Sequence, residues 1–462
     1  MALQKLRRLP APAFPRALIR PAPKPLSPTA WIDGLRGLAA LIVTVDHLFW
    51  SELTPIFPGY LSRPAAQNTS LLQLPPFRLL SAAHAMVPLF FVLSGLCIAL
   101  GPIRARRTKT LLPALSSAAF RRPLRLFLPV LAVALASQLL HALGAYSAWP
   151  WLDDADALPT GPSPAAHARY LAAYVGTLVD AAATGAHCGG QGSADCPVGL
   201  NAQLWTLPLE LRGSYVVYAA VLALAGARRG GRRVGVLGAL AVVLLYRGWW
   251  EGATFLAGLL VAEVEEWRGG AVAAAGGLPV AVEKGRRRGG CGGVGVAALG
   301  AVGVYLVCLP GGSEESGFGP CYDFLFAWLT PRRWLVVGGL DTAIWCWRAL
   351  GGAAFVGALS GGGSVSLLLR RPFVSGAAQY FGRISFMLYL VHQMVIRTLL
   401  LRVRPALAGM LGVEQSGGLA VYMAGTVVLV ISFWVAEVLV EVLDKKSVAL
   451  AKRLWEKWSA AA

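Results

Sequence analysis

The sequence predicts an all-α protein, a polytopic bundle of about ten transmembrane helices with both termini in the cytosol. Composition is the first observation behind this prediction. Of the 462 residues, 56% are hydrophobic and only 14% are charged, and the mean hydropathy is +0.59. Such a chain has too little polar sequence for the surface of a soluble globule. We therefore expect a multi-pass integral membrane protein in an endomembrane or the plasma membrane.

The second observation is the number of apolar stretches. About ten are long enough to cross about 30 Å of hydrocarbon at about 1.5 Å per residue. A weaker Ala-rich stretch, 168–184, is assigned to a loop, where an interfacial helix is the alternative. The predicted spans are 34–51, 84–102, 124–145, 202–225, 234–250, 252–267, 292–309, 335–359, 380–401 and 419–443.

The third observation is that clusters of Lys and Arg fall on one side of the membrane in a ten-span arrangement. Basic residues near membrane spans mark the cytosolic side. We expect a disordered, basic, Pro-rich cytosolic tail at 1–30, a membrane domain at 31–445 and a basic cytosolic tail at 446–462. The clusters are Lys5 to Lys24, Arg104 to Lys109 with Arg121 and Arg122, Arg228 to Arg233, Lys284 to Arg288, Arg370 with Arg371, and Lys445 to Arg453.

The loops on the opposite side have a different character. Residues 146–200 are rich in Asp and contain Cys188 and Cys196, which are candidates for a disulfide in an oxidising compartment. Asn68 begins an N-x-S/T pattern on the same side and is a candidate glycosylation site. Both features agree with the orientation that the basic clusters predict.

The net charge of +19 does not indicate a nucleic-acid partner, because the basic residues lie in short clusters between apolar stretches. There is no P-loop, no dinucleotide-binding fingerprint and no Cys/His spacing typical of zinc. We therefore expect no metal site and no permanently bound cofactor.

The first span carries ionisable residues, which are costly inside a membrane and usually face a bundle interior or a wet cavity. Arg36 and His47 are eleven residues apart, so on an α-helix they share one face and lie about 16 Å apart along the axis. Asp33 joins that face, whereas Asp46 points about 100° away from His47. A purely structural explanation is an Asp33–Arg36 salt bridge at the inner interface with a buried, hydrogen-bonded His47.

Other spans also contain polar groups. Ser94-Gly95 interrupts the second span, which helix packing alone would explain. Glu210 lies in the fourth span, where a carboxylate needs a partner. In the ninth span Ser385, Tyr389 and His392 form one polar stripe.

These motifs together resemble the acyltransferase 3 family of integral-membrane acyltransferases, especially its fungal members. The resemblance runs from Asp33 to His392 in the expected order. The Gly-rich region 268–378 departs from it in having weak, interrupted spans. The motifs are DGLRGLAALIVTVDH, FFVLSGL, FRRPLRLFLP, LWTLPLEL and GRISFMLYLVH.

The resemblance implies transfer of an acyl group, usually acetyl, from acyl-CoA as co-substrate to a hydroxyl of a carbohydrate or other small acceptor. His47 is the expected general base, since a neutral imidazole suits proton removal near pH 7. Glu210 or Asp46 would orient His47, and His392 would support the same cavity. The expected donor- and substrate-binding residues are Asp33, Arg36, Ser94, Arg121, Arg122, Arg125 and Tyr389.

Two other classes of function remain open at this stage. A secondary transporter also has many spans with buried charges, but it predicts repeat symmetry with broken helices in corresponding halves. A binding protein without catalysis predicts that His47 tolerates substitution.

Overall fold

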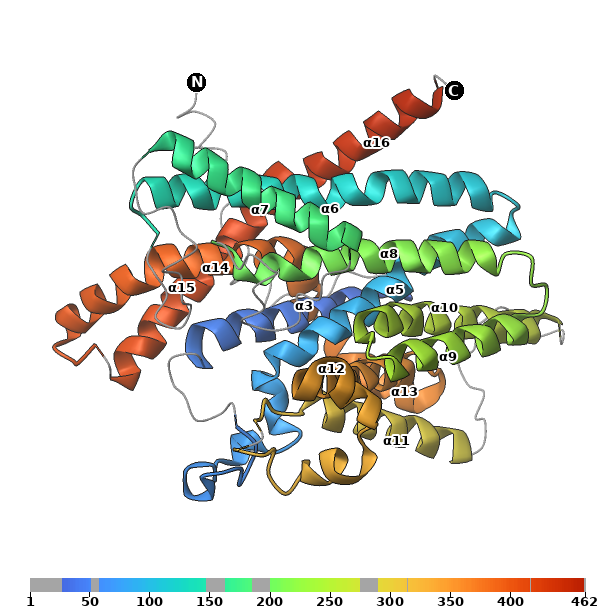
Figure 1. Ribbon diagram of the computed structural model, residues 1–462, viewed down its shortest axis with the longest axis horizontal. Coiled ribbons are helices and arrows are strands. Elements are labelled where there is room, and N and C mark those ends of the chain that lie inside the picture. The colour runs from blue at the N-terminus through green and yellow to red at the C-terminus, as the bar shows by residue number, and fades with distance from the viewer. Residues whose placement is uncertain are drawn as a thin grey trace. The chain divides into compact units, whose positions relative to one another are not determined.

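The computed structural model describes residues 27–50, 58–146, 163–184, 200–274, 290–313, 315–415 and 417–460. Within these ranges the regular elements are helices joined by turns, with no strand, as Figure 1 shows. The all-α prediction is confirmed. The chain divides into two compact units, which are described separately. Unit 1 comprises 1–54, 120–211 and 373–462, and unit 2 comprises 55–119 and 212–372.

Unit 1 contains the first span, the last two spans and the described helix from the 146–200 region. Helices α6 and α8 and the short helix η9 contribute residues to both units. The elements are α3 (Ala30–Val45), the π-helix η1 (Asp46–Trp50), α6 (Leu111–Ala142), α7 (Pro164–Thr184), η6 (Ala202–Trp205), α8 (Thr206–Ala223), η9 (Arg371–Val374), α14 (Gly376–Leu411), α15 (Gly418–Leu439), the π-helix η10 (Val440–Asp444) and α16 (Lys445–Ala460).

Unit 2 contains the second span and the central helices of the chain. The described residues of its Gly-rich part lie largely in helices, and one of these, α12, is interrupted at Gly338 and Gly339. The elements are η2 (Ala65–Gln67), η3 (Leu71–Gln73), η4 (Phe77–Ser81), α5 (Ala83–Arg107), α9 (Gly230–Tyr246), α10 (Trp250–Ala274), α11 (Gly290–Val307), η8 (Leu325–Leu329), α12 (Arg332–Ser360) and α13 (Gly363–Arg370).

Each predicted span coincides with a helix, but fewer helices are individually long and apolar enough to cross a membrane. Among the described residues there are five, with a shorter apolar helix at Gly292–Val307. The span count of about ten therefore stays a prediction. Helices α3 and α9, with 16 and 17 residues, are short, and α8 and α10 carry ion-paired residues. The five are Ala83–Arg107, Leu111–Ala142, Arg332–Ser360, Gly376–Leu411 and Gly418–Ala460.

One region differs from its predicted form. The 168–184 stretch, predicted as a loop with an interfacial helix as the alternative, lies in the helix α7. The basic segment after residue 445 is the helix α16, with side chains of both polar and apolar character along it.

In unit 1, α3 and α14 approach closely at a pair of glycines. A Cβ on Gly37 would overlap the backbone at Gly382, and a Cβ on Gly382 would overlap the backbone at Asp33. Small residues allow such contact between helix backbones in a membrane. His47 and His392 each lie ten residues beyond one of these glycines. The two chain segments run in the same direction from this contact, so the same offset brings the histidines together.

In unit 2, α5 and α10 pack in a similar way. A Cβ on Gly95 would overlap the backbone at Phe255, and one on Gly258 would overlap the backbone at Val92. This contact supports the helix-packing explanation for the small residues of the second span.

Unit 2 also contains a buried ion-pair network. The Glu263 carboxylate, with a side-chain exposure of 1%, accepts from Arg106 Nη1 at 2.6 Å and from Arg233 Nε at 2.9 Å. A buried charge is tolerated when it is paired and hydrogen-bonded. This carboxylate therefore ties α5, α9 and α10 together.

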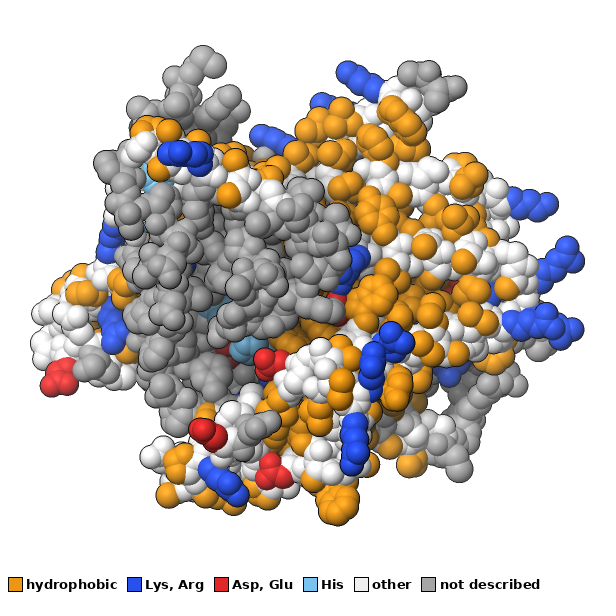
Figure 2. Space-filling view, viewed as in Figure 1, with side chains coloured by type: hydrophobic (Ala, Val, Ile, Leu, Met, Phe, Trp, Pro, Cys, Tyr) orange, Lys and Arg blue, Asp and Glu red, His pale blue; other side chains and the backbone are white. Residues whose placement is uncertain are grey.

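The outer surface of α9 is apolar. Val236, Val242 and Val243 are 52%, 67% and 54% exposed, and Figure 2 shows hydrophobic side chains over this helix with Lys and Arg gathered near the α8–α9 turn. Exposed apolar side chains on a helix with basic residues at its end are expected where the helix contacts lipid.

Candidate active site

His47 and His392 form a direct hydrogen-bonded pair in unit 1. His47 Nδ1 lies 2.9 Å from His392 Nε2, and the two rings stack with their centroids 5.1 Å apart and an interplanar angle of 6°. His392 is fully buried, whereas His47 is only partly buried. His47 is therefore the more exposed member of the pair.

The other nitrogen of His392 fixes the proton positions of the pair. His392 Nδ1 lies 3.1 Å from the Leu388 carbonyl oxygen, which can only accept a hydrogen bond. Burial favours the uncharged ring, so the single proton of His392 resides on Nδ1 and Nε2 carries a lone pair. His47 must then donate from Nδ1. The remaining nitrogen of His47, Nε2, consequently carries a lone pair and can accept a proton.

His47 lies in a π-helix rather than in the α-helical part of the first span. The π-helix η1 begins at Asp46, one residue before His47. Single π turns have a wider hydrogen-bonding pattern than the α-helix and occur frequently at functional sites. The direction of His47 relative to Arg36 therefore does not follow from a rotation of 100° per residue over the whole segment.

Tyr389 lies beside the histidine pair, one turn before His392 on α14. Its ring centroid is 6.0 Å from that of His392. The Tyr389 hydroxyl donates to the Gln203 carbonyl oxygen at 2.6 Å and lies 2.7 Å from Thr206 Oγ1. Gln203 Nε2 in turn donates to the Leu390 carbonyl oxygen at 2.8 Å. These bonds fasten the start of α8 to the part of α14 that carries His392.

Glu210, which is predicted to support His47, forms an ion pair with Arg122 in the structure. Glu210 Oε1 accepts from Arg122 Nη2 at 2.6 Å, with side-chain exposures of 21% for Glu210 and 10% for Arg122. The partner that the structure shows for His47 Nδ1 is His392. Glu210 thus neutralises one of the arginines at the start of the third predicted span.

Arg36 and Asp33 form the salt bridge that the structural explanation of the first span requires. Their closest atoms, Arg36 Nη1 and Asp33 Oδ1, are 3.4 Å apart, and the Asp33 side chain is 58% exposed. An exposed pair of this kind contributes little to stability and leaves the guanidinium accessible to other anions.

Arg125 joins Arg36 and Arg122 in one electrostatic cluster. Arg125 interacts with both of these arginines and with the carboxylates of Glu210 and Asp444. Arg121 precedes Arg122 on α6. The predicted donor-binding arginines of α3 and α6 are therefore brought together in unit 1.

The remaining predicted site residues lie elsewhere. Ser94 is on α5 in unit 2. Asn68 is 3% exposed, and its Nδ2 donates to the carbonyl oxygens of Ser62 at 3.1 Å and Pro64 at 3.3 Å. A glycan on this nitrogen would replace one of its two hydrogens, and with it one of these hydrogen bonds. Cys188 and Cys196 lie outside the described residues.

Some residues near the histidine pair carry no sequence signal of their own. Gln203 directly precedes the LWTLPLEL motif and Thr206 is its third residue, but both look like ordinary polar residues. Arg397, by contrast, did carry a signal, because an arginine inside a predicted span is unusual. It lies on α14 beyond His392 and is 1% exposed. Its Cζ lies 4.8 Å from the centroid of the Tyr146 ring.

Comparison with known proteins shows the family of the chain. An acyltransferase domain model, that of the acyltransferase 3 family, matches residues 29–437. The chain is 25% identical to O-acetyltransferase PaAT-1 of Phomopsis amygdali, over 94% of this chain and 86% of that protein. It is 27% identical to acyltransferase clz18 of Cochliobolus lunatus, over 80% and 83% of the two chains.

A further relative is acyltransferase R4 of Phoma sp., which is 26% identical over 81% of this chain and 84% of that protein. No solved structure matches this chain. Because the family model spans most of the sequence and the relatives are covered over most of their length, the chain belongs to the acyltransferase 3 family and is a membrane acyltransferase.

Proposed function

We propose that this enzyme transfers an acyl group, acetyl in the simplest case, from acyl-CoA to a hydroxyl of a carbohydrate or other small acceptor, with His47 as general base. The observation that carries the proposal is the His47–His392 pair, because its hydrogen bonds leave a lone pair on His47 Nε2. The name of the relative PaAT-1, an O-acetyltransferase, supports the acetyl group and the oxygen acceptor.

The proposed reaction follows from this proton arrangement. His47 Nε2 removes the proton of the acceptor hydroxyl while the hydroxyl oxygen attacks the thioester carbonyl carbon. The tetrahedral intermediate collapses with cleavage of the carbon–sulfur bond, and the proton on His47 Nε2 passes to the leaving thiolate. His392 accepts the hydrogen bond from His47 Nδ1 throughout, which holds the ring orientation and favours the imidazolium that forms.

The acceptor can be identified by comparing cells with and without the gene. Extracts from cells that lack the enzyme should contain the unacylated acceptor, and purified enzyme with isotope-labelled acetyl-CoA should transfer label to it. Transfer of label only in the presence of an extract fraction supports the proposal. A purified, correctly inserted enzyme that transfers no acyl group from any acyl-CoA contradicts it.

The arginines of α3 and α6 are proposed to hold the donor phosphates. Guanidinium groups form strong, paired hydrogen bonds with phosphate oxygens. About 16 Å separates residues eleven positions apart on a helix, a length that suits an extended pantetheine arm reaching from Arg36 toward His47.

This role of Arg122 can be separated from its ion pair with Glu210. Arg122→Gln is expected to raise the KM for acetyl-CoA about tenfold or more, because a charge-assisted hydrogen bond to a phosphate is lost. Glu210→Gln breaks the same ion pair but releases Arg122, so the donor KM should fall or stay unchanged. Steady-state kinetics with varied acetyl-CoA measures both. Equal effects of the two substitutions would indicate that only the ion pair matters.

The orientation of the chain is also proposed, from the basic clusters, with both termini in the cytosol. Tags at either terminus should bind antibody only after the membrane is permeabilised. In sealed vesicles whose cytosolic face is on the inside, a tag inserted after Thr184 should bind antibody that is added to the outside. If antibody binds an N-terminal tag without permeabilisation, the chain has the opposite orientation. The proposed donor site would then not face the cytosol.

A further inference from the structure

The last helical segment of unit 1 passes from a predicted membrane span into a basic helix without a loop. Helices α15, η10 and α16 form one continuous segment, Gly418–Ala460. The 22 residues of α15 extend over about 33 Å, which is enough to cross the hydrocarbon of a bilayer. Helix α16 therefore begins close to the membrane surface.

Helix α16 stays near that surface along its length. Trp455 lies ten residues beyond Lys445, about 15 Å further along the helix. Its ring centroid is nevertheless 5.5 Å from that of Phe120 in α6, and the Trp458 ring stacks on the same Phe120 with 5.6 Å between the centroids. Phe120 lies four residues before the predicted third span. Because its far end contacts a residue at the start of another span, α16 lies along the membrane interface.

One exposed face of α16 is basic. The helix contains five cations and one carboxylate, that of Glu456. Lys446, Arg453 and Lys457 are exposed, and at separations of seven and four residues they share one helix face. We call these three residues the basic ridge.

An apolar ridge lies beside the basic ridge. Leu450, Leu454 and Trp458 follow one another at intervals of four residues and are 45%, 39% and 58% exposed. Ser447 and Ala451, on the inner side of this ridge, are only 5% and 1% exposed. Over α16, at the upper right of Figure 2, hydrophobic side chains lie next to Lys and Arg. The protein thus covers the inner face of α16 and leaves both ridges at the surface.

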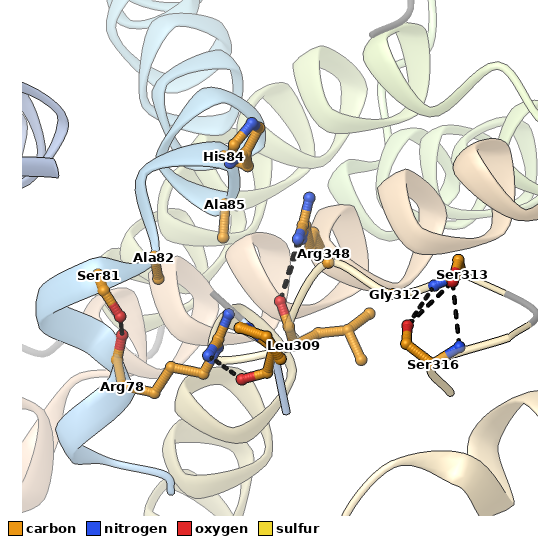
Figure 3. Close-up of a pocket in the computed structure, with 12 residues that line it drawn as sticks. Arg78, Ser81, Ala82, His84, Ala85, Leu309, Gly312, Ser313, Ser316 and Arg348 are labelled. Atoms are coloured by element: carbon orange, nitrogen blue, oxygen red, sulfur yellow. Dashed lines mark hydrogen bonds between the residues drawn. The ribbon is translucent and has the colours of Figure 1, made fainter. Parts of the chain in front are cut away.

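Cations in the interior of unit 2 have different surroundings. Arg78 and Arg348 line a cavity and are 3% and 6% exposed. Arg78 Nη1 donates to the Pro58 carbonyl oxygen at 3.0 Å, and Arg348 Nη2 donates to the Leu309 carbonyl oxygen at 3.1 Å (Figure 3). These guanidinium groups are held inside the protein, whereas the basic ridge is directed to the surroundings.

We propose that α16 binds anionic phospholipids of the leaflet along which it lies. The basic ridge contacts the headgroup oxygens, and the apolar ridge inserts between the adjoining acyl chains. Basic residues on one face with Leu and Trp on the next are typical of helices that lie in a membrane interface. In the proposed orientation this leaflet is the cytosolic one, whose anionic lipids attract nearby Lys and Arg. The binding does not depend on acyl transfer.

Hydrogen–deuterium exchange of the purified full-length enzyme in nanodiscs measures this binding at α16 itself. The amides of residues 445–460 should exchange more slowly as phosphatidylserine replaces phosphatidylcholine, and the slowing should saturate. Phosphatidylethanolamine, which carries no net charge, should not slow the exchange. Added salt should weaken the effect of phosphatidylserine, because ions screen exposed charges.

Substitution of the basic ridge tests the role of its charges. The triple variant Lys446→Gln, Arg453→Gln, Lys457→Gln should weaken the binding on the order of 100-fold, about fivefold for each cation, and thereby abolish the slowing. These side chains are exposed, so the fold should persist. Glu456→Gln removes the carboxylate of the helix and should strengthen the binding instead.

A matched control removes the same number of exposed cations from another part of the chain. The triple variant Arg228→Gln, Arg229→Gln, Arg232→Gln changes the α8–α9 turn and should leave the slowing at α16 unchanged. An equal loss in the two triple variants would mean that total charge, and not α16, attracts the lipid, which contradicts the proposal.

The apolar ridge is tested separately. The double variant Leu450→Gln, Leu454→Gln keeps every charge and should also weaken the binding, because less apolar surface enters the bilayer. Equal exchange of α16 in phosphatidylcholine and phosphatidylserine would overturn the proposal. Slowing that appears only when a soluble cell extract is added would assign the helix to a protein partner and would overturn it as well.

Discussion

His47→Ala is expected to lower the turnover number for acyl transfer by about 10²- to 10⁴-fold, the contribution typical of a positioned general base. The substitution removes the partly exposed imidazole whose Nε2 carries the lone pair. Turnover of the purified variant at saturating acetyl-CoA and acceptor measures the effect. The donor KM should change little, because the arginine cluster that is proposed to bind the donor is intact.

A matched histidine provides the control for this substitution. His141, in α6 of the same unit, packs edge-on against Tyr146 and His167 and has no part in the proposed chemistry. His141→Ala should retain most of the turnover in the same preparation. Near-normal turnover in His47→Ala would mean that another group removes the hydroxyl proton.

Substitution of His392 should give the second-largest effect. His392→Leu removes the acceptor for His47 Nδ1 and leaves the His47 ring free to rotate or change its proton position. In serine proteases, loss of a group that holds the catalytic imidazole in one tautomer lowers the turnover number by as much as about 10⁴-fold. We expect on the order of 10²-fold here, because the lost partner is a neutral ring and not a carboxylate.

The positioning role of His392 can be distinguished from simple packing. His392→Gln offers an amide oxygen that can accept from His47 Nδ1, so it should recover part of the turnover that His392→Leu loses. Both changes remove a buried ring. If the Gln and Leu variants lose turnover equally, with the same unfolding temperature, His392 contributes volume and not orientation.

The helices were largely predictable because a long apolar stretch in a membrane must satisfy its backbone hydrogen bonds within itself, which a helix does. Apolar stretches of sufficient length predicted helices, and each predicted span coincides with one. The form of α12 was not predictable in the same way, because its break at Gly338 and Gly339 depends on local backbone conformation. The division into two units combines segments far apart in the chain and depends on tertiary packing.

The candidate site was predictable in its residues but not in its pairings. Intramembrane histidines are rare enough for His47 and His392 to stand out. Their direct contact depends on the Gly37–Gly382 approach and on the π-helix at Asp46, and neither feature follows from helical periodicity. The cost of a carboxylate inside a span likewise indicated that Glu210 needs a partner. It could not identify Arg122 as that partner, since Arg122 lies 88 residues earlier in the chain.

The most direct test of the histidine pair is the turnover number of four proteins: the wild type, His47→Ala, His392→Leu and the double variant. If His392 acts only through His47, the double variant should turn over at the rate of His47→Ala, because residues that act as a unit are strongly non-additive. A double variant whose loss is the product of the two single losses, in protein that inserts normally, would contradict a base at His47 oriented by His392.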